Sequence, residues 1–243
     1  MTRRAFTLAD SVAALLGLAA LAALGCATAE AQRTEKSKAY NLDKLRLTMR
    51  DVASYCEAHD GAMPNFGLPD NPASAARYRS LTRFDDFQTL RAQEYTAIVT
   101  RWPSVLEEWL GRADDRWYSD SGPRASGMVG GHAPESEFRY SLTMVTAPTM
   151  WQWPGRTGVP WTDLQRNFEV VKRDRIAFPS RKGVFLFDRG DRRGYWLVAF
   201  ADGAADERAV ADGIPGAQVP WSERVLRGRA VLATINGYLG RDY

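Results

Sequence analysis

Residues 11–29 read SVAALLGLAALAALGCATA, which is nineteen consecutive residues without a charged side chain. As an α-helix this run spans about 28 Å, close to the ~30 Å hydrocarbon thickness of a bilayer. A core helix of this length normally has a polar face, and here only Ser11 and Thr28 are polar. The run therefore predicts a membrane-spanning or export segment, and Arg3 and Arg4 mark its start as cytoplasmic.

The composition of the chain excludes several classes of protein. It has 243 residues, 45% of them hydrophobic, with eight Trp, nine Tyr and ten Phe, so most of it is expected to fold. Two Cys and two His argue against a zinc site of the usual kind and exclude a disulfide framework. The net charge of +3 comes from scattered Arg and Lys, so no nucleic-acid partner is predicted.

Three export signals compete for the N-terminal segment. A cleaved secretory signal would use the small residues of 27–29 or 29–31, and residues 2–6 resemble the twin-arginine pattern. A lipoprotein signal would use Cys26, which follows Ala23-Leu24-Gly25 in a loose lipobox. The third alternative is a prepilin leader.

That third alternative rests on Arg3-Arg4-Ala5-Phe6-Thr7-Leu8-Ala9-Asp10, which resembles the signature of type IV prepilins and pseudopilins. The resemblance implies that a prepilin peptidase cuts between Ala5 and Phe6 and methylates the new N-terminus. It also implies that Asp10 takes the place of the Glu usual in the family and pairs with the α-amino group of a neighbouring subunit, because a lone carboxylate in an apolar helix is costly.

The helix is expected to continue beyond the apolar run. Leu42, Leu45, Met49, Val52 and Cys56 recur at spacings of three and four and predict a buried stripe. The intervening positions are charged and predict a polar face, formed by Asp43, Lys44, Arg46, Arg50, Asp51 and Glu57. With Gly61 and Pro64 as stop signals, one helix is predicted to run from the leader to about His59.

Four stretches resemble a branch of pseudopilin-like proteins abundant in planctomycetes. Residues 41–64 resemble its helix and the following turn, and residues 139–144, 178–188 and 197–203 resemble its C-terminal strands. In that branch a His-x9-Asp-Gly signature closes the region. Asp202 and Gly203 match the end of the signature, whereas Arg192 stands where the family has His.

The C-terminal half also predicts a sheet from its own residues. Runs 184–188 and 195–201 are rich in β-branched and aromatic residues and predict a hairpin, followed by a short strand over 208–210. A further strand is expected over 138–145, a short helix over 102–111 and a last helix over 224–239.

These predictions define an α+β fold in which a long N-terminal helix, membrane-spanning and then amphipathic, packs on a small antiparallel sheet in a pilin-like manner. The expected parts are a leader over 1–5, a transmembrane or filament-core helix over 6–29, its amphipathic extension over 30–62 and an α+β head domain over 63–243.

No catalytic set emerges from the sequence, so no enzymatic activity is predicted. Cys56 and His59 lie three residues apart, but the first continues the apolar stripe and the second suits the helix end. Trp151 and Trp153 form a candidate interaction loop. No metal or other cofactor is expected beyond calcium, which is bound by some major pseudopilins and has five candidate carboxylates here, on Asp114, Asp115, Asp120, Asp188 and Asp191.

The expected function is that of a non-enzymatic subunit of a type II secretion or type IV pilus-like assembly. Its partners would be the bacterial inner membrane, a prepilin peptidase, and other pilin-like subunits or further copies of itself. The chain would cross the inner membrane once, with the head outside the cytoplasm. The competing hypothesis is an exported or lipid-anchored binding protein with a cleaved signal and a Trp-rich ligand surface.

Overall fold

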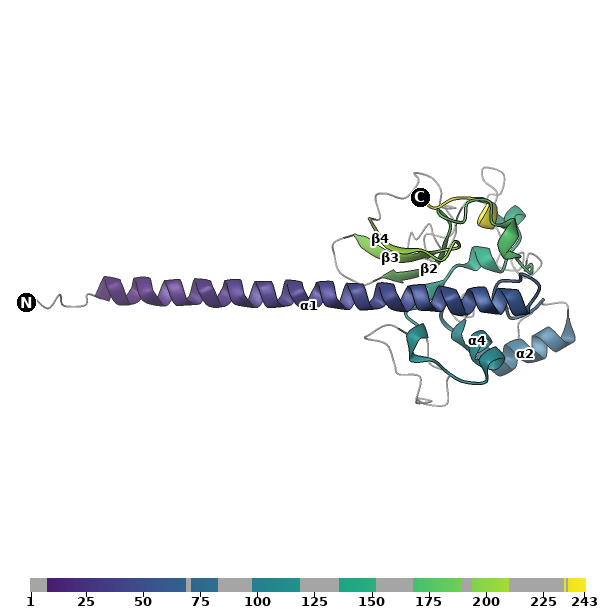
Figure 1. Ribbon diagram of the computed structural model, residues 1–243, viewed down its shortest axis with the longest axis horizontal. Helices are drawn as coiled ribbons and strands as arrows, with labels where there is room; N and C mark the ends of the chain where they lie inside the picture. Colours follow the sequence, from purple (N-terminus) through teal and green to yellow (C-terminus); the bar gives the residue numbers. More distant parts are fainter. Residues whose placement is uncertain are drawn as a thin grey trace, which may run out of the picture. The chain divides into compact units, whose positions relative to one another are not determined.

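The computed structural model describes residues 8–68, 71–82, 98–118, 136–151, 168–188, 194–209, 234 and 236–243. The chain divides into two compact units, Met1–Tyr40 and Asn41–Tyr243, which we call the N-terminal and C-terminal units. Helix α1, Leu8–Ala58, contributes to both (Figure 1). The predicted helix therefore forms and ends within one residue of His59. The Ala5–Phe6 processing site lies outside the described residues.

The end of α1 is fixed by two left-handed residues. Asp60 and Gly61 have φ angles of 53° and 79°. The Gly61 N–H donates to the Cys56 carbonyl at 2.7 Å, which satisfies a carbonyl that the helix leaves open. Gly61 is thus the stop signal that the sequence predicts.

The C-terminal unit has an α+β fold. Its sheet contains β1 (Phe138–Tyr140), β2 (Gly183–Asp188), β3 (Tyr195–Phe200) and β4 (Ala205–Ala209), in the order β1-β2-β3-β4 with antiparallel neighbours. From Asn41 onward, α1 lies between this sheet and helices α2 (Pro72–Thr82) and α4 (Pro103–Leu110) (Figure 1). The Arg46 side chain donates to the Ala205 carbonyl of β4, and Tyr55 packs edge-on against Trp109 of α4.

The predicted apolar stripe of α1 forms the centre of the core. Leu42, Leu45, Met49, Val52 and Cys56 are at most 9% exposed. They belong to one hydrophobic cluster with Trp102, which directly precedes α4, and with buried aromatic residues of the sheet. Those sheet residues include Phe138, Tyr140 and Phe185. The Trp102 and Phe185 rings lie 4.5 Å apart, and the Trp102 indole donates to the Phe138 carbonyl at 2.6 Å.

One residue assigned to the polar face is buried instead. Lys44 is 9% exposed, and its ammonium donates to the Tyr118 carbonyl at 3.0 Å. The long aliphatic stem of lysine tolerates this position because the charged end reaches an acceptor. The polar face of α1 is therefore narrower than the sequence pattern indicates.

Several local predictions are confirmed and others are wrong. The hairpin forms as β2 and β3, and α4 begins with Pro103 and ends at Gly111, whose φ is 68°. The strand predicted over 138–145 stops at Tyr140, because the chain turns into a 3₁₀ helix at Leu142–Met144. The strand predicted over 208–210 is β4, which begins earlier. Of the last predicted helix, the described end is a 3₁₀ turn, Gly237–Leu239.

Candidate functional site

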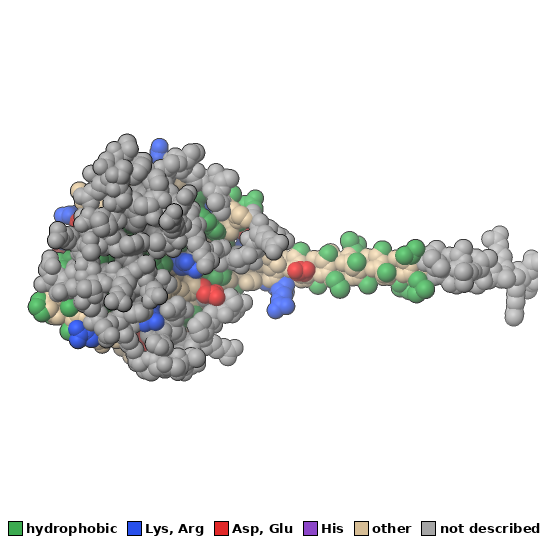
Figure 2. All heavy atoms as spheres, turned by 180° about the vertical axis from the view of Figure 1, so that it is seen from behind, with side chains coloured by type: hydrophobic (Ala, Val, Ile, Leu, Met, Phe, Trp, Pro, Cys, Tyr) green, Lys and Arg blue, Asp and Glu red, His purple; other side chains and the backbone are tan. Residues whose placement is uncertain are grey.

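The first candidate site is the apolar part of α1 in the N-terminal unit. Five leucines are 64–67% exposed: Leu15, Leu16, Leu18, Leu21 and Leu24. At about 100° per residue they are distributed around the whole helix axis, with no gap wider than about 100°. Figure 2 shows hydrophobic side chains on both sides of this part of the helix. A single partner surface could not cover them all.

Leaving these leucines in water is unfavourable. Burying one leucine side chain is worth about 2 kcal/mol, so five represent on the order of 10 kcal/mol. Within the described parts of the chain, α1 is the one helix that is long and apolar enough to cross a membrane, and none of its apolar window is buried. Asp10 lies on α1 directly before the uncharged run, although the structure does not describe its side chain.

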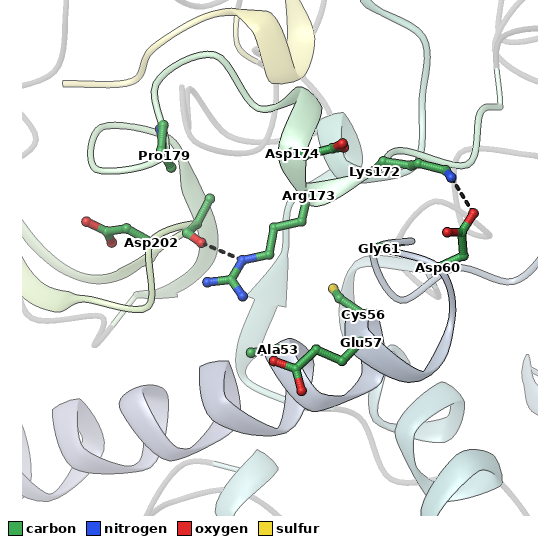
Figure 3. Close-up of a pocket in the computed structure, with 11 residues that line it drawn as sticks. Ala53, Cys56, Glu57, Asp60, Gly61, Lys172, Arg173, Asp174, Pro179 and Asp202 are labelled. Atoms are coloured by element: carbon green, nitrogen blue, oxygen red, sulfur yellow. Dashed lines mark hydrogen bonds and ion pairs between the residues drawn. The ribbon is translucent and has the colours of Figure 1, made fainter.

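The second candidate site is a pocket in the C-terminal unit. It encloses about 720 Å³ beside the last turns of α1 (Figure 3). Its wall is built where the turn after α1 pairs with a distant segment: the Arg173 N–H donates to the Gly61 carbonyl and the Met63 N–H to the Val171 carbonyl, both at 2.8 Å. Eleven residues line the pocket: Ala53, Cys56, Glu57, Asp60, Gly61, Lys172, Arg173, Asp174, Pro179, Ala201 and Asp202.

Charged side chains surround the pocket, and two of them are held in place. Arg173 donates through Nε to the Ala201 carbonyl at 3.3 Å, and Figure 3 shows its guanidinium beside Glu57 and Cys56. The Lys172 ammonium binds the exposed Asp60 carboxylate and lowers the pKa of that carboxyl. The pocket thus has both basic and acidic groups on its lining and no single sign of charge.

Cys56 is not an activated nucleophile. Burial raises the pKa of its thiol to about 11, and the thiol contacts the Met63 sulfur at 3.7 Å. The His59 ring stacks on Tyr55 at 3.9 Å, and its Nδ1 lies 2.8 Å from the Tyr55 carbonyl. The His59 N–H donates to the Cys56 carbonyl at 3.1 Å, but no described contact joins the Cys56 thiol to the His59 ring, so both residues have the structural roles that the sequence favours.

Asp202 lines the pocket, and with Gly203 it forms the turn that resembles the end of the His-x9-Asp-Gly signature. The Asp202 carboxylate accepts the Ala204 N–H at 2.9 Å, and Gly203 has a φ of 98°. Together they turn the chain from β3 into β4, where Phe200 donates its N–H to the Ala204 carbonyl at 2.8 Å. The turn therefore has a clear structural reason. Arg192 lies outside the described residues.

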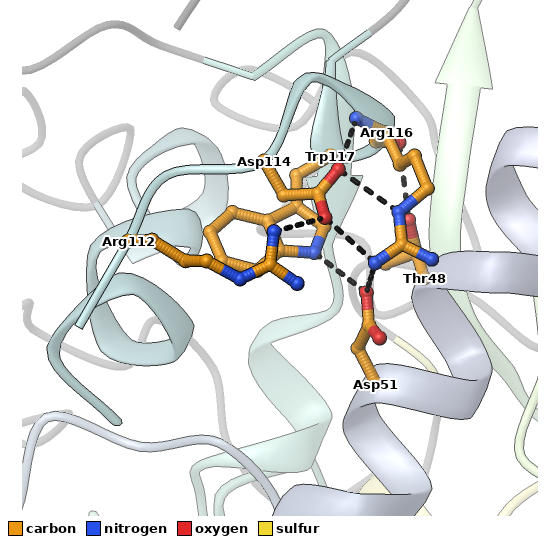
Figure 4. Close-up of polar contacts among 6 residues, drawn as sticks. All are labelled: Thr48, Asp51, Arg112, Asp114, Arg116 and Trp117. Atoms are coloured by element: carbon orange, nitrogen blue, oxygen red, sulfur yellow. Dashed lines mark hydrogen bonds and ion pairs between the residues drawn. The ribbon is translucent and has the colours of Figure 1, made fainter. Parts of the chain in front are cut away.

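A network of polar contacts anchors the segment after α4 to α1 (Figure 4). Arg116 binds the Asp114 carboxylate at 2.6 and 2.9 Å and the Asp51 carboxylate at 3.4 Å. Asp51 also accepts the Trp117 indole N–H at 2.9 Å. Hydrogen bonds from Arg116 lower the pKa of Asp114. Arg112 also forms an ion pair with Asp114 at 3.4 Å. The Asp114 carboxylate, a calcium candidate in the sequence, is therefore paired with two arginines.

Of the other calcium candidates, the structure describes the side chain of Asp115 alone. Asp115 begins the 3₁₀ helix Asp115–Trp117, and Asp188 ends β2 with a side chain that is not described. Asp120 and Asp191 lie outside the described residues. Among the residues that the structure describes, no group of three or more His, Cys, Asp or Glu side chains forms a metal site.

Trp151 does not belong to an exposed interaction loop, and this prediction is corrected. Its side chain is fully buried, and its indole donates to the Thr146 hydroxyl at 2.8 Å. The Pro that follows Trp153 suggests an exposed turn in the sequence, but Trp151 precedes it in the 3₁₀ helix Pro148–Trp151 and packs inward. Trp153 lies outside the described residues.

A buried polar cluster was not anticipated from the sequence. Lys182 and Asp242 have fully buried side chains, with Nζ and Oδ1 3.3 Å apart. The Thr234 hydroxyl accepts a hydrogen bond from Lys182 and donates one to Asp242. The Gly183 N–H donates to the other carboxylate oxygen of Asp242 at 2.7 Å. Lys182 lies 52 positions before Thr234 and 60 before Asp242, so no local pattern reveals the cluster.

Comparison with known proteins does not assign the chain to a family. No protein-family model matches it, and neither a curated protein nor a solved structure does.

Proposed function

We propose that the chain is a non-enzymatic, pilin-like subunit, a pseudopilin, of a type II secretion or type IV pilus-like assembly. The observation that carries the proposal is the ring of five exposed leucines between residues 15 and 24. An apolar surface on every side of a helix needs a surrounding apolar phase, which a bilayer or a bundle of identical helices supplies.

The residues before this ring supply the rest of the argument. The short basic leader, the predicted cut between Ala5 and Phe6, and Asp10 just before the apolar run together resemble a prepilin signature. In the proposed mechanism the helix is held in the bacterial inner membrane and is later withdrawn into a filament core. Asp10 then pairs with the α-amino group of a neighbouring Phe6, which offsets the cost of a carboxylate among apolar side chains.

The proposed topology follows the positive charges. Arg3 and Arg4 keep the start of the chain cytoplasmic, so the C-terminal unit lies in the periplasm or outside the cell. A prepilin peptidase and other pilin-like subunits are the expected partners.

The competing hypothesis of an exported binding protein with a Trp-rich ligand surface has less support. Each described tryptophan is packed into the core or against it: Trp102, Trp109, Trp117, Trp151 and Trp196. These residues stabilise the C-terminal unit and do not offer a stacking surface. The pocket beside α1 is the feature of the described residues that a small ligand would use.

The role of Asp10 provides a test of assembly. We expect Asp10→Ala to reduce recovery of the chain in assembled complexes about tenfold or more, because the α-amino group of the neighbouring subunit loses its partner. The N-terminus should still be processed. Asp10→Glu is the matched control, since it keeps the charge, and should assemble like the original chain. Normal assembly of Asp10→Ala would contradict the proposal.

A further inference from the structure

We propose that Lys182 and Asp242 become joined by an intramolecular isopeptide bond between Nζ and the carboxyl carbon Cγ. The inference starts from the buried cluster at the beginning of β2, where a primary amine and a carboxyl group lie 3.3 Å apart without exposure to solvent. The bond does not depend on the pilin-like function, because it concerns the interior of the C-terminal unit.

The surroundings favour the uncharged forms that amide formation requires. Burial lowers the pKa of the Lys182 amine and raises the pKa of the Asp242 carboxyl. Moving the proton from Lys182 to Asp242 gives a neutral amine, which is a nucleophile, and a neutral acid, which can lose a hydroxyl group. The fixed distance replaces the encounter of two separate molecules and so removes much of its entropic cost.

Each further group needed for the condensation has a counterpart in the cluster. Lys182 Nζ attacks Cγ of Asp242 and forms the C–N bond, while the negative charge that develops on Oδ2 is stabilised by the Gly183 N–H. The Thr234 hydroxyl contacts both Nζ and Oδ1, so it can take a proton from the nitrogen and pass one to Oδ1. The Cγ–Oδ1 bond then breaks and one water leaves. Amine and acid yield amide and water, with no oxidant or reductant.

The bond would tie the segment around Asp242 to the first strand residues of the central hairpin. The two residues are separated by 60 positions in the chain. The backbone already aligns them, because the Asp242 N–H donates to the Arg181 carbonyl at 3.0 Å. This hydrogen bond holds the backbone of the two segments side by side.

Tryptic peptide mapping of the purified full chain tests the proposal. Trypsin cuts after Arg181 and Arg241 but not after an acylated lysine. We expect one branched product, in which the peptide 182–189 carries on Lys182 the peptide that begins at Asp242. The intact chain should also be lighter than its sequence by the mass of one water, after allowance for N-terminal processing. Cleavage after Lys182 and an unchanged intact mass in the folded chain would overturn the proposal.

Variants separate the roles of the three side chains. Asp242→Asn should give the same branched product with loss of ammonia, whereas Asp242→Ala should give none. Thr234→Val keeps the shape but removes the hydroxyl, and we expect it to slow bond formation roughly a hundredfold. If Asp242→Ala does not fold, tryptic mapping of the original chain still shows whether the Lys182–Asp242 bond is present. An equal rate in Thr234→Val would contradict the proposed relay.

Discussion

Two stretches of the same helix, α1, differ in how their apolar residues are arranged. Between residues 15 and 24 the leucines lie around the whole axis and are 64–67% exposed. In the C-terminal unit the five stripe residues, Leu42, Leu45, Met49, Val52 and Cys56, fall within an arc of about 80° around the axis, given about 100° per residue, and are at most 9% exposed. Both stretches are helical, so the difference teaches that their environments are set by the distribution of apolar side chains. Apolar residues on one side of a helix can pack into a protein core. Apolar residues on every side need an apolar phase around the helix.

The largest expected effect lies in the buried stripe. Leu45→Ala should lower the free energy of unfolding of the C-terminal unit by about 2–5 kcal/mol, because it leaves a cavity in a closely packed core. Denaturant unfolding of the detergent-solubilised full chain, followed by tryptophan fluorescence, measures the loss. Leu21→Ala is the matched control and should leave this transition unchanged. Equal losses in the two variants would remove the distinction between stripe and ring.

The ring should respond to charge. Leu21→Arg is expected to disfavour membrane insertion by about 2.5–3.5 kcal/mol, the cost of an arginine near the centre of a spanning helix. Fractionation of cells into membrane and soluble pools measures the effect, and Leu21→Ile provides the uncharged control. The unfolding of the C-terminal unit should not change. An unaltered membrane fraction would show that this stretch is not within a bilayer.

A smaller effect is expected where the segment after α4 is anchored to α1. Asp114→Asn should cost about 1 kcal/mol of unfolding free energy, because it weakens the contacts with Arg116. The folded-state pKa of Asp114 is lowered, so its contribution is complete above the ordinary pKa of 3.8 and is lost as the pH falls through the lower folded-state value. Stability measured between pH 7 and pH 2 should therefore fall less in Asp114→Asn.

The reactivity of the two cysteines compares the two stretches of α1 without a mutation. Cys26 is exposed, whereas Cys56 is buried and its thiol pKa is raised from 9.0 to about 11. At pH 8 the thiolate fraction of Cys56 is therefore about a hundredfold lower than that of an ordinary thiol. In detergent, a membrane-permeant maleimide should modify Cys26 in the folded chain and Cys56 only after denaturation, as read by mass spectrometry. Rapid labelling of Cys56 in the folded chain would contradict the packing of α1.

Sequence patterns predict much of the fold because several elements carry local signals. Gly61 and Gly111 end their helices, and the β2–β3 hairpin follows from two short runs rich in β-branched and aromatic residues. Helix α2 was missed, although Asn71 before Pro72 is a start signal: the Asn71 side chain accepts the Ala73 N–H at 2.9 Å.

Contacts between distant residues were beyond the reach of local patterns. Lys44 donates to the Tyr118 carbonyl, and Trp151 is buried in the core. Lys182 contacts Asp242, which lies 60 positions later in the chain. The periodicity of apolar residues places Lys44 on the surface of the helix. It contains no information about the Tyr118 carbonyl, which a distant segment supplies and which allows the lysine to be buried. The pocket beside α1 has the same origin, since its walls join residues 53–61 with residues 172–174 and 201–202.

The central claim is that the ring of leucines belongs to a processed pilin-like helix, and the mature N-terminus tests it most directly. Mass spectrometry of the chain isolated from the membrane of its own host should find an N-terminus at Phe6, with or without an N-methyl group. A lipid-modified N-terminus at Cys26, or an unmodified one at Glu30 or Gln32, would contradict the account and identify the apolar run as an ordinary export signal.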